Sequence, residues 1–264
     1  MVPQILAVVL TVSASAMQQQ APAPRPSFDA FDAATIKPVD PGPKGGRYII
    51  MQGADTFLAK NYTLELLIAA AYELNPRMIL SAPSWAESIH YDIVARTPGE
   101  VRPTHEEQMQ MLRSLLADRF KLTFHRQQKV LSIYELEVDK DSPRMKPSAE
   151  APDDLPKVIS TVYPDHMTLP ARNVNMGDFA SLLQRSVLDR PVVDKTALTG
   201  RFDFDLTWAQ DATQFGGEVP AAPSDATSPP LFIAIREQLG LRLEATKGPV
   251  EVLVIDSAQP PSPN

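Results

Sequence analysis

Two aspartates near residue 204 are the first side chains whose spacing suggests chemistry. Asp203 and Asp205 lie in Arg201 to Trp208, a stretch that alternates apolar and polar residues and therefore predicts a half-buried strand. Side chains along a strand have a period of two, so both carboxylates face the same side. Such a pair can bind a cation or share a proton as an acid–base pair. The simpler interpretation, which we favour, is a solvated face opposite Phe202 and Phe204.

Three further charged residues complete the candidate site. Asp92 occupies the middle of Tyr91-Asp92-Ile93, which matches Phe202-Asp203-Phe204 in pattern. Asp194 and Arg201 flank a polar turn that ends at Gly200, and together they can present both charges to a ligand. Turn chemistry alone also accounts for Asp and Gly at such positions.

Trp85 is the aromatic candidate. It follows Pro83-Ser84 in a segment without periodicity, where an exposed indole can serve as a docking platform for a peptide or a sugar. The alternative, a plug that closes the core, is the interpretation we favour.

The four histidines do not predict a metal site. His105 follows Thr104, which with Glu107 fits a helix capping box, so a structural role is expected there. A cluster of His90, His125 and Asp92 is the alternative that strand pairing permits, and we give it little weight. The chain also lacks the G-x-S-x-G, S-x-x-K, H-E-x-x-H, P-loop and G-x-G-x-x-G motifs. We therefore predict no metal and no cofactor.

Composition excludes several classes of protein. The 264 residues include no cysteine, which rules out disulfides, thiol nucleophiles and zinc–thiolate sites. With 25 basic and 32 acidic residues the net charge is −7, which argues against a nucleic-acid surface. No segment after the N-terminal leader is long and apolar enough to span a membrane.

Two stretches, 61–94 and 173–208, share one pattern and predict an internal duplication. In each, an asparagine or threonine cap precedes an amphipathic helix that is followed by a proline and then a strand. A second helix then runs into two successive strands. The helices expected to be equivalent are Thr63–Leu74 with Asn175–Leu188, and His105–Asp118 with Leu231–Gln238. The predicted fold class is α+β, with two duplicated halves of helix-strand-helix-strand-strand type and mainly antiparallel sheet packed on helices.

A basic run, formed by Lys121, His125, Arg126 and Lys129, falls between the two strands expected in the first half. We interpret it as a solvated hairpin tip. The alternative is a contact surface for an acidic partner or a polyanionic wall polymer.

The start of the chain predicts export. An apolar run, Val2 to Val12, precedes the small residues Ala14-Ser15-Ala16, as in a secretory signal peptide, although no basic residue comes first. A periplasmic or secreted location follows. The expected divisions are a signal peptide at 1–16, a Pro- and Gln-rich linker at 17–27, a first half at 28–140, a hinge at 141–164, a second half at 165–257 with a flexible loop or binding lid at 210–230, and a tail at 258–264.

Ordered motifs along nearly the whole mature chain carry a family resemblance. They are Phe31 to Pro38, Asn61 to Leu64, Ser84-Trp85, Tyr91 to Ile93, Leu115 to Leu122, Arg190 to Asp203 and Gly248 to Asp256. Together they resemble a soil-associated family of unknown function expanded in Acidobacteria. The resemblance implies an exported protein with no assigned reaction, metal or ligand, and relatives that are fused to membrane metallopeptidase sensors of the antibiotic-sensing type. The helix–strand–strand units also resemble the short N-terminal domains of secretins and TonB-dependent receptors.

The function predicted from these observations is an exported binding or interaction module. Its available surfaces are the sheet edges, the cleft between the halves and Trp85, and its expected partner is an envelope protein, a peptide or a cell-wall fragment. The alternative is an extracytoplasmic hydrolase that uses Asp92, Asp203 and Asp205 in the cleft between the halves. A sensor domain without a ligand of its own is a third, weaker interpretation.

Overall fold

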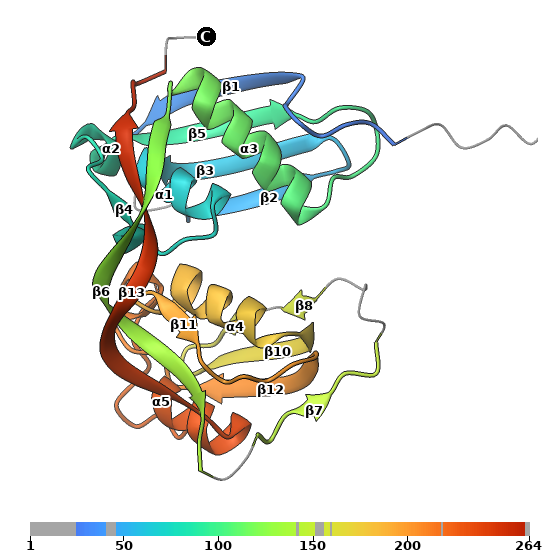
Figure 1. Cartoon of the computed structure of the whole chain (residues 1–264). Helices are drawn as coiled ribbons and strands as arrows, with labels where there is room; N and C mark the ends of the chain where they lie inside the picture. Colours follow the sequence, from blue (N-terminus) through green and yellow to red (C-terminus); the bar gives the residue numbers. More distant parts are fainter. Residues whose placement is uncertain are drawn as a thin grey trace, which may run out of the picture.

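The computed structural model describes residues 25–40, 46–140, 143–150, 156–158, 160–217 and 219–261. The predicted signal peptide and parts of the predicted linker, hinge and tail lie outside these residues. Figure 1 shows two lobes that lie one above the other and are joined along one side by a long two-stranded ribbon. The first lobe is built from the N-terminal part of the chain and the second lobe from the C-terminal part.

The first lobe has a four-stranded antiparallel sheet in the order β1-β5-β3-β2, with helices α1 and α3 on one face. Thr63 caps α1, because its hydroxyl accepts a hydrogen bond from the Leu66 amide at 3.3 Å. The elements are β1 (Ala33–Val39), β2 (Tyr48–Gln52), β3 (Thr56–Thr63), α1 (Leu64–Ala71), η1 (Pro76–Met78), β4 (Ile79–Leu80), α2 (Trp85–Ser88), β5 (His90–Arg96) and α3 (His105–Arg119).

The second lobe has a sheet in the order β7-β12-β10-β8, in which β9 also pairs with β10. Asn175 caps α4 in a capping box with Asp178. The elements are β7 (Lys146–Pro147), β8 (Lys157–Val158), β9 (Thr161–Val162), β10 (Met167–Val174), α4 (Met176–Leu182), η2 (Leu183–Val187), β11 (Val192–Asp194), β12 (Phe202–Trp208), η3 (Gln214–Gly217), α5 (Leu231–Ala234) and η4 (Ile235–Leu239).

The ribbon consists of β6 (Thr123–Val138) and β13 (Leu241–Ser257), which pair antiparallel along almost their whole length. The prediction of two successive strands in each half is wrong, because each half ends in one continuous strand. The basic run therefore lies along the first part of β6, with Lys121 just before the strand, and not at a hairpin tip. At the two ends of the ribbon, β4 adds to β13 and β11 adds to β6, both in parallel.

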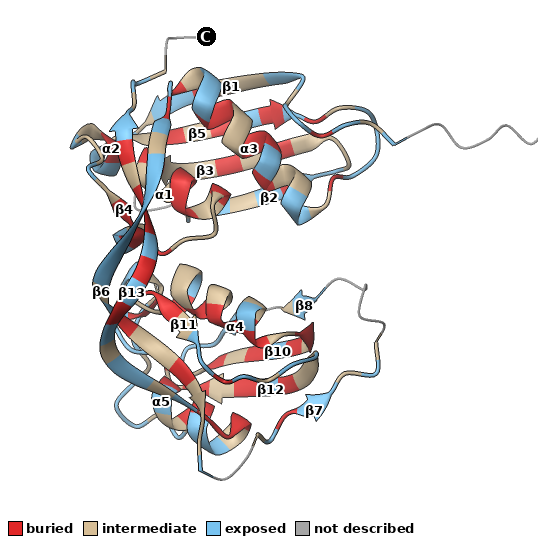
Figure 2. Ribbon diagram, viewed as in Figure 1, coloured by how far each residue is buried: buried red, intermediate tan, exposed pale blue. Residues whose placement is uncertain are grey.

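Each ribbon strand contributes to the hydrophobic cores of both lobes (Figure 2). In the first lobe Leu253 and Ile255 of β13 pack with the helices and the sheet. In the second lobe Leu136 of β6 and Leu241 of β13 do the same. A small third cluster around Ile133 lies between the two cores. The lobes are therefore coupled through shared strands. The domain boundaries expected from the sequence remain predictions.

The sequence-predicted fold class is confirmed as α+β with mostly antiparallel sheet. The four expected helices are present as α1, α3, α4 with η2, and α5 with η4. Thr104 and Glu107 form the expected capping box at the start of α3. The internal duplication remains a prediction.

The same bulge occurs in the central strand pair of each lobe. Asn61 and Asn173 have left-handed backbones, with φ of 60° and 57°. Their amides donate to the carboxylates of Asp92 at 3.0 Å and of Asp203 at 2.9 Å. Asparagine tolerates this backbone region better than most residues, and the carboxylate satisfies an amide that the bulge removes from the strand ladder. Asp92 and Asp203 therefore hold the chain in position just before a helix cap.

Asp92→Ala and Asp203→Ala should each lower the free energy of unfolding by about 1 kcal/mol, because each leaves a bulge amide without its acceptor. Hydrogen bonding to the Asn173 amide lowers the pKa of Asp203, so its stabilising effect is complete above the unfolded value of 3.8 and is lost as the pH falls below it. Urea unfolding at pH 7 and pH 3 measures both effects. Asp205→Ala is the control, since that side chain is exposed and forms a surface ion pair with Arg172. Equal losses in all three variants would contradict a special role for the bulges.

Candidate functional site

A pocket of about 620 Å³ opens between the two lobes. Its volume is within the range of small-molecule sites. The first lobe contributes β2, α1, η1 and the start of α3, and the second lobe contributes η2 and η3. The residues that line it are Arg47, Ile49, Tyr62, Leu66, Ala69, Ala70, Leu74, Asn75, Pro76, Arg77, His105, Gln108, Met109, Gln184, Arg185, Ser186, Leu188, Asp189, Thr213, Phe215, Gly216 and Val219.

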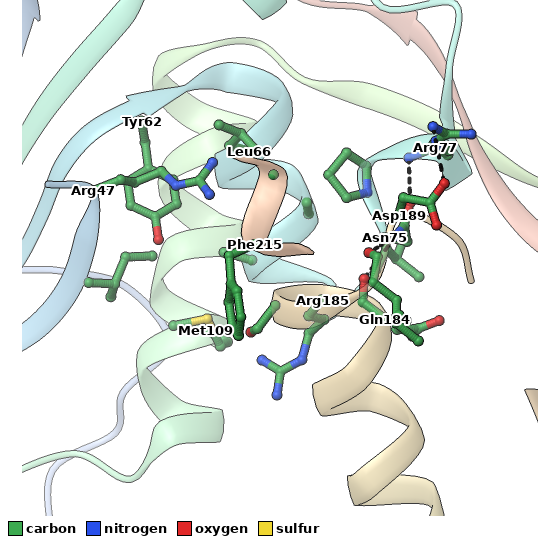
Figure 3. A pocket seen from close by; sticks show the side chains of 18 of the residues that line it. Arg47, Tyr62, Leu66, Asn75, Arg77, Met109, Gln184, Arg185, Asp189 and Phe215 are labelled. Carbon is green, nitrogen blue, oxygen red and sulfur yellow. Dashed lines mark hydrogen bonds and ion pairs between the residues drawn. The ribbon is translucent and has the colours of Figure 1, made fainter. Parts of the chain in front are cut away.

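Asn75 fixes the back of the pocket by joining the lobes (Figure 3). Its buried amide nitrogen donates to the backbone oxygens of Gln184 at 2.8 Å and Leu188 at 3.3 Å. Its side-chain oxygen accepts from the Arg77 amide at 2.9 Å and so caps η1. Asn75 thereby links the cap of η1 to one carbonyl within the π-helical turn η2 and to the carbonyl of the residue that follows it.

Gln184 makes the reciprocal connection. Its side-chain nitrogen donates to the Glu73 backbone oxygen at 3.3 Å, across the lobe boundary. Its side-chain oxygen accepts from the Val192 amide, also at 3.3 Å, within its own lobe. The start of η1 and the π-helical turn η2 are thus held together from both sides.

Glu73 supplies a negative charge at the boundary between the lobes. Its carboxylate lies 3.1 Å from the His105 Nε2 and 3.6 Å from the Arg185 guanidinium. The hydrogen bond to His105 lowers the pKa of Glu73, and the positive charges of Arg185 and Arg113 act in the same direction. Glu73 therefore stays ionised and helps to orient Arg185 at the edge of the pocket.

A second ion pair lines the pocket beside Asn75 (Figure 3). Arg77 lies 3.6 Å from Asp189, and the Tyr134 hydroxyl donates to the same carboxylate at 3.3 Å. Arg190 covers the Tyr134 ring at 5.1 Å from its centre. Burial and the Asp189 charge raise the pKa of Tyr134, so its hydroxyl stays protonated and able to donate.

The segment 210–230 reaches the pocket through Phe215. This residue has a left-handed backbone, with φ of 53°, and its ring lies parallel to Trp208 at 6.5 Å. Buried Gln214 accepts a hydrogen bond from the Trp208 indole at 2.8 Å, which anchors the segment to the second core. In Figure 3 the Phe215 ring enters the pocket between Met109 and Arg185. The segment therefore contributes a side chain to the pocket, while a lid role and the flexibility of the segment both remain predictions.

The family model named Protein of unknown function (DUF3738) matches residues 65–258. The chain belongs to this family. No curated protein and no solved structure shows detectable similarity to the chain. In this member of the DUF3738 family, no helix among the described residues has the length and apolar character needed to cross a bilayer. The match agrees with the resemblance to a family without an assigned reaction. Its range covers the second lobe and the first lobe from α1 onward, but not β1, β2 and β3.

None of the six residues singled out from the sequence lines the pocket of this DUF3738 protein. Asp92 and Asp203 hold the two bulges, and Asp205 pairs with Arg172 at 2.8 Å on the surface. The three aspartates named for the hydrolase alternative therefore lie outside the described pocket lining, and the alternative itself remains a prediction. Among the described lining residues, Asp189 is the only carboxylate.

The other three have local partners. Asp194 accepts from the Thr196 amide at 2.9 Å and forms the turn that its sequence suggests. Arg201 donates to the Asn173 backbone oxygen at 2.7 Å and so braces the second bulge. Trp85, at the start of α2, is half-buried and packs against the first core. These contacts are structural, and any ligand role for these residues remains a prediction.

The histidines also have separate partners. His90 Nδ1 lies 3.2 Å from the Asn61 backbone oxygen, and His125 pairs with Asp256 at 2.8 Å. Within the part of the chain that the structure describes, no three His, Cys, Asp or Glu side chains are grouped to hold a metal ion.

Glu65 has the most strongly shifted carboxyl that the structure shows. It lies in the first turn of α1, outside the pocket lining, where burial and then the charge of Glu87 raise its pKa to about 7. The folded state therefore binds the Glu65 proton more tightly than the unfolded state does. This group contributes most to stability below its unfolded value of 4.5, and the contribution is lost as the pH rises through about 7.

Glu65→Gln should consequently stabilise the protein at pH 8.5 by about 1 kcal/mol and change little at pH 4.5. This free energy is smaller than the pKa shift alone would give, because the Glu65 side chain is only half-buried and solvent screens its charge. Urea unfolding of both proteins at the two pH values measures the difference. Glu87→Gln, the control, should give a smaller gain because Glu87 is the lesser cause. A gain for Glu65→Gln that is the same at both pH values would show that the titration of Glu65 is not responsible.

Proposed function

We propose that this DUF3738 protein is an exported binding module whose ligand site is the pocket between the lobes. The observation that supports the proposal best is the construction of the pocket. Apolar and polar side chains from both lobes, in about equal number, converge on a space of about 620 Å³, a size typical of small-molecule sites. Asn75 and Gln184 hold the walls at fixed positions, so much of the cost of arranging the site is met before a ligand arrives.

Binding is favoured over catalysis by what the pocket contains. Hydrolysis by paired acids needs convergent carboxylates, whereas the described lining has one carboxylate, Asp189, that is engaged by Arg77 and Tyr134. The strongly raised pKa of Glu65 belongs to a residue outside the lining. His105 also lines the pocket, but its Nε2 is hydrogen-bonded to the Glu73 carboxylate, and among the described lining residues no second carboxylate accompanies Asp189.

Export is supported by sequence alone. The apolar run at Val2 to Val12, the Ala14-Ser15-Ala16 site and the absence of cysteine suit a protein released into the periplasm or outside the cell. Expression of the full chain in a Gram-negative host, followed by mass spectrometry of the periplasmic protein, tests this proposal. An N-terminus at Met17 is expected. An uncleaved protein in the cytoplasm would contradict export.

The ligand-site proposal is tested by thermal unfolding of the exported protein with peptides, cell-wall fragments, sugars and divalent metals, because a ligand of the folded state raises the midpoint. Ala70→Trp fills the pocket from α1, and any upward shift should disappear in this variant. Ala117→Trp is the control, because it places the same side chain at an exposed position of α3 outside the pocket. A shift that survives in Ala70→Trp would place the binding site elsewhere.

We also propose that the two lobes arose by duplication. The matching bulges at Asn61 and Asn173, the helix caps two residues later and the parallel additions of β4 and β11 to the ribbon support this origin. An experimental structure tests it by superposition of α1 on α4 and α3 on α5. Lobes whose sheets and helices do not superpose in the same order would overturn it.

A further inference from the structure

We propose that the pocket takes a small anion with an apolar body, such as a medium-chain carboxylate, and that Arg185 binds its charged end. This inference rests on the proposed function, because it specifies the ligand of the same pocket.

The charge of the pocket differs from that of the whole protein. The chain has a net charge of −7, but the pocket lining has three arginines and, among its described residues, one aspartate. Glu73, which lies next to Arg185, reduces this excess of positive charge but does not reverse it. Positive charge concentrated in a concave, partly desolvated site attracts an anionic ligand and strengthens its hydrogen bonds.

Arg185 is well placed to use that charge. Its side chain is 27% exposed, and its nearest carboxylate contact, Glu73, is at 3.6 Å, longer than an ordinary hydrogen bond. Its Nε donates to the Ser181 backbone oxygen at 3.3 Å, which fixes the plane of the guanidinium. A guanidinium has five N–H donors, so the terminal nitrogens still have donors to offer a ligand carboxylate. Glu73 is itself bound by His105, which holds it on the far side of this contact.

The apolar side of the pocket fits the other end of such a ligand. Leu66 and Met109 come from the first lobe, and Phe215 enters from the second (Figure 3). Arg47, next to them, lies over the Tyr62 ring at 5.4 Å from its centre. An inorganic anion would make no contact with this apolar wall. A carboxylate with a hydrocarbon body uses both parts.

The test is titration calorimetry of the exported protein with octanoate and with octanamide, which has the same chain length and no charge. Octanoate should bind at least about tenfold more tightly, because its hydrogen bonds to Arg185 are charge-assisted. Arg185→Gln should remove most of this preference and leave octanamide binding unchanged. Arg126→Gln is the control, since it makes the same charge change at an exposed position on β6, outside the pocket lining.

Each contrary outcome identifies a different error. Equal binding of octanoate and octanamide, both lost in Ala70→Trp, would overturn the preference for an anion and leave the pocket as the ligand site. If Arg185→Gln and Arg126→Gln lower the affinity for octanoate equally, the effect comes from the net charge of the protein and not from a contact with Arg185. Octanoate binding that survives in Ala70→Trp would overturn the proposed function itself. Failure of both compounds to bind the unaltered protein at millimolar concentration would overturn this ligand class.

Discussion

Replacing Asn75 by alanine is expected to lower the free energy of unfolding by about 2–3 kcal/mol, a large effect for one polar side chain. The amide is buried and links the cap of η1 to two backbone oxygens of the other lobe. Alanine leaves those oxygens without their donor and the η1 amide without its cap. Urea denaturation followed by circular dichroism gives the value.

Asn75→Asp separates the hydrogen bonds from packing. Aspartate has nearly the same shape and keeps the cap, but at neutral pH it places a negative charge against the oxygens of Gln184 and Leu188. Its pKa in the folded state should be raised, so the variant should lose stability as the pH rises from 4 to 7, when the unfolded carboxyl has already ionised. A protonated aspartate can donate again, which makes the variant most like the native protein at pH 4. If Asn75→Asp loses the same stability at every pH, the hydrogen bonds donated by the Asn75 amide are not the cause of the loss.

The local parts of the fold were predictable because their signals are local. A cap residue followed by apolar residues at three- and four-residue spacing is enough to place α1 and α4, and Thr104 with Glu107 is enough to start α3. The Tyr91-Asp92-Ile93 and Phe202-Asp203-Phe204 patterns likewise identified two related strands. Their aspartates were selected for spacing that suits chemistry, whereas their contacts are with the backbone amides of the bulges.

The pocket was not predictable because it depends on contacts between distant parts of the chain. Asn75 lies 109 residues from its partner Gln184. Glu73, in the turn after α1, is separated by a similar length of chain from Arg185 in η2. In the sequence, each of these side chains looks like an ordinary polar residue at a helix end. One weak signal was present, since Gln210 to Pro230 is longer than a compact lobe needs, and this segment supplies Phe215.

The ribbon was missed for a related reason. Gly248-Pro249 is a dipeptide typical of turns, and Gln127-Gln128-Lys129 has no apolar alternation, so both stretches suggested breaks between strands. In the structure they lie next to each other in the middle of the ribbon, where Val130 pairs with Pro249 and Leu131 with Gly248. Pairing between two strands that are far apart in sequence overrides both local signals, because each strand completes the ladder of the other.

Gly248 has a packing role that the second large prediction tests. A Cβ at this position would lie 2.6 Å from the Ile133 Cδ1, and Ile133 is buried in the cluster between the lobes. Gly248→Ala should therefore lower the free energy of unfolding by about 1–3 kcal/mol through overpacking. Ile133→Val removes the clashing methyl group and alone should cost about 1 kcal/mol.

The double variant Gly248→Ala with Ile133→Val is expected to be more stable than Gly248→Ala alone, because the new methyl group occupies the space that the isoleucine vacates. Urea unfolding of the native protein, both single variants and the double variant completes the cycle, with a coupling free energy of about 1 kcal/mol or more. Additive losses would mean that a side chain at position 248 and the Ile133 side chain do not compete for the same space. A favourable coupling would show instead that a turn-like dipeptide is accommodated in a continuous strand because the missing side chain lets Ile133 close the space between the lobes.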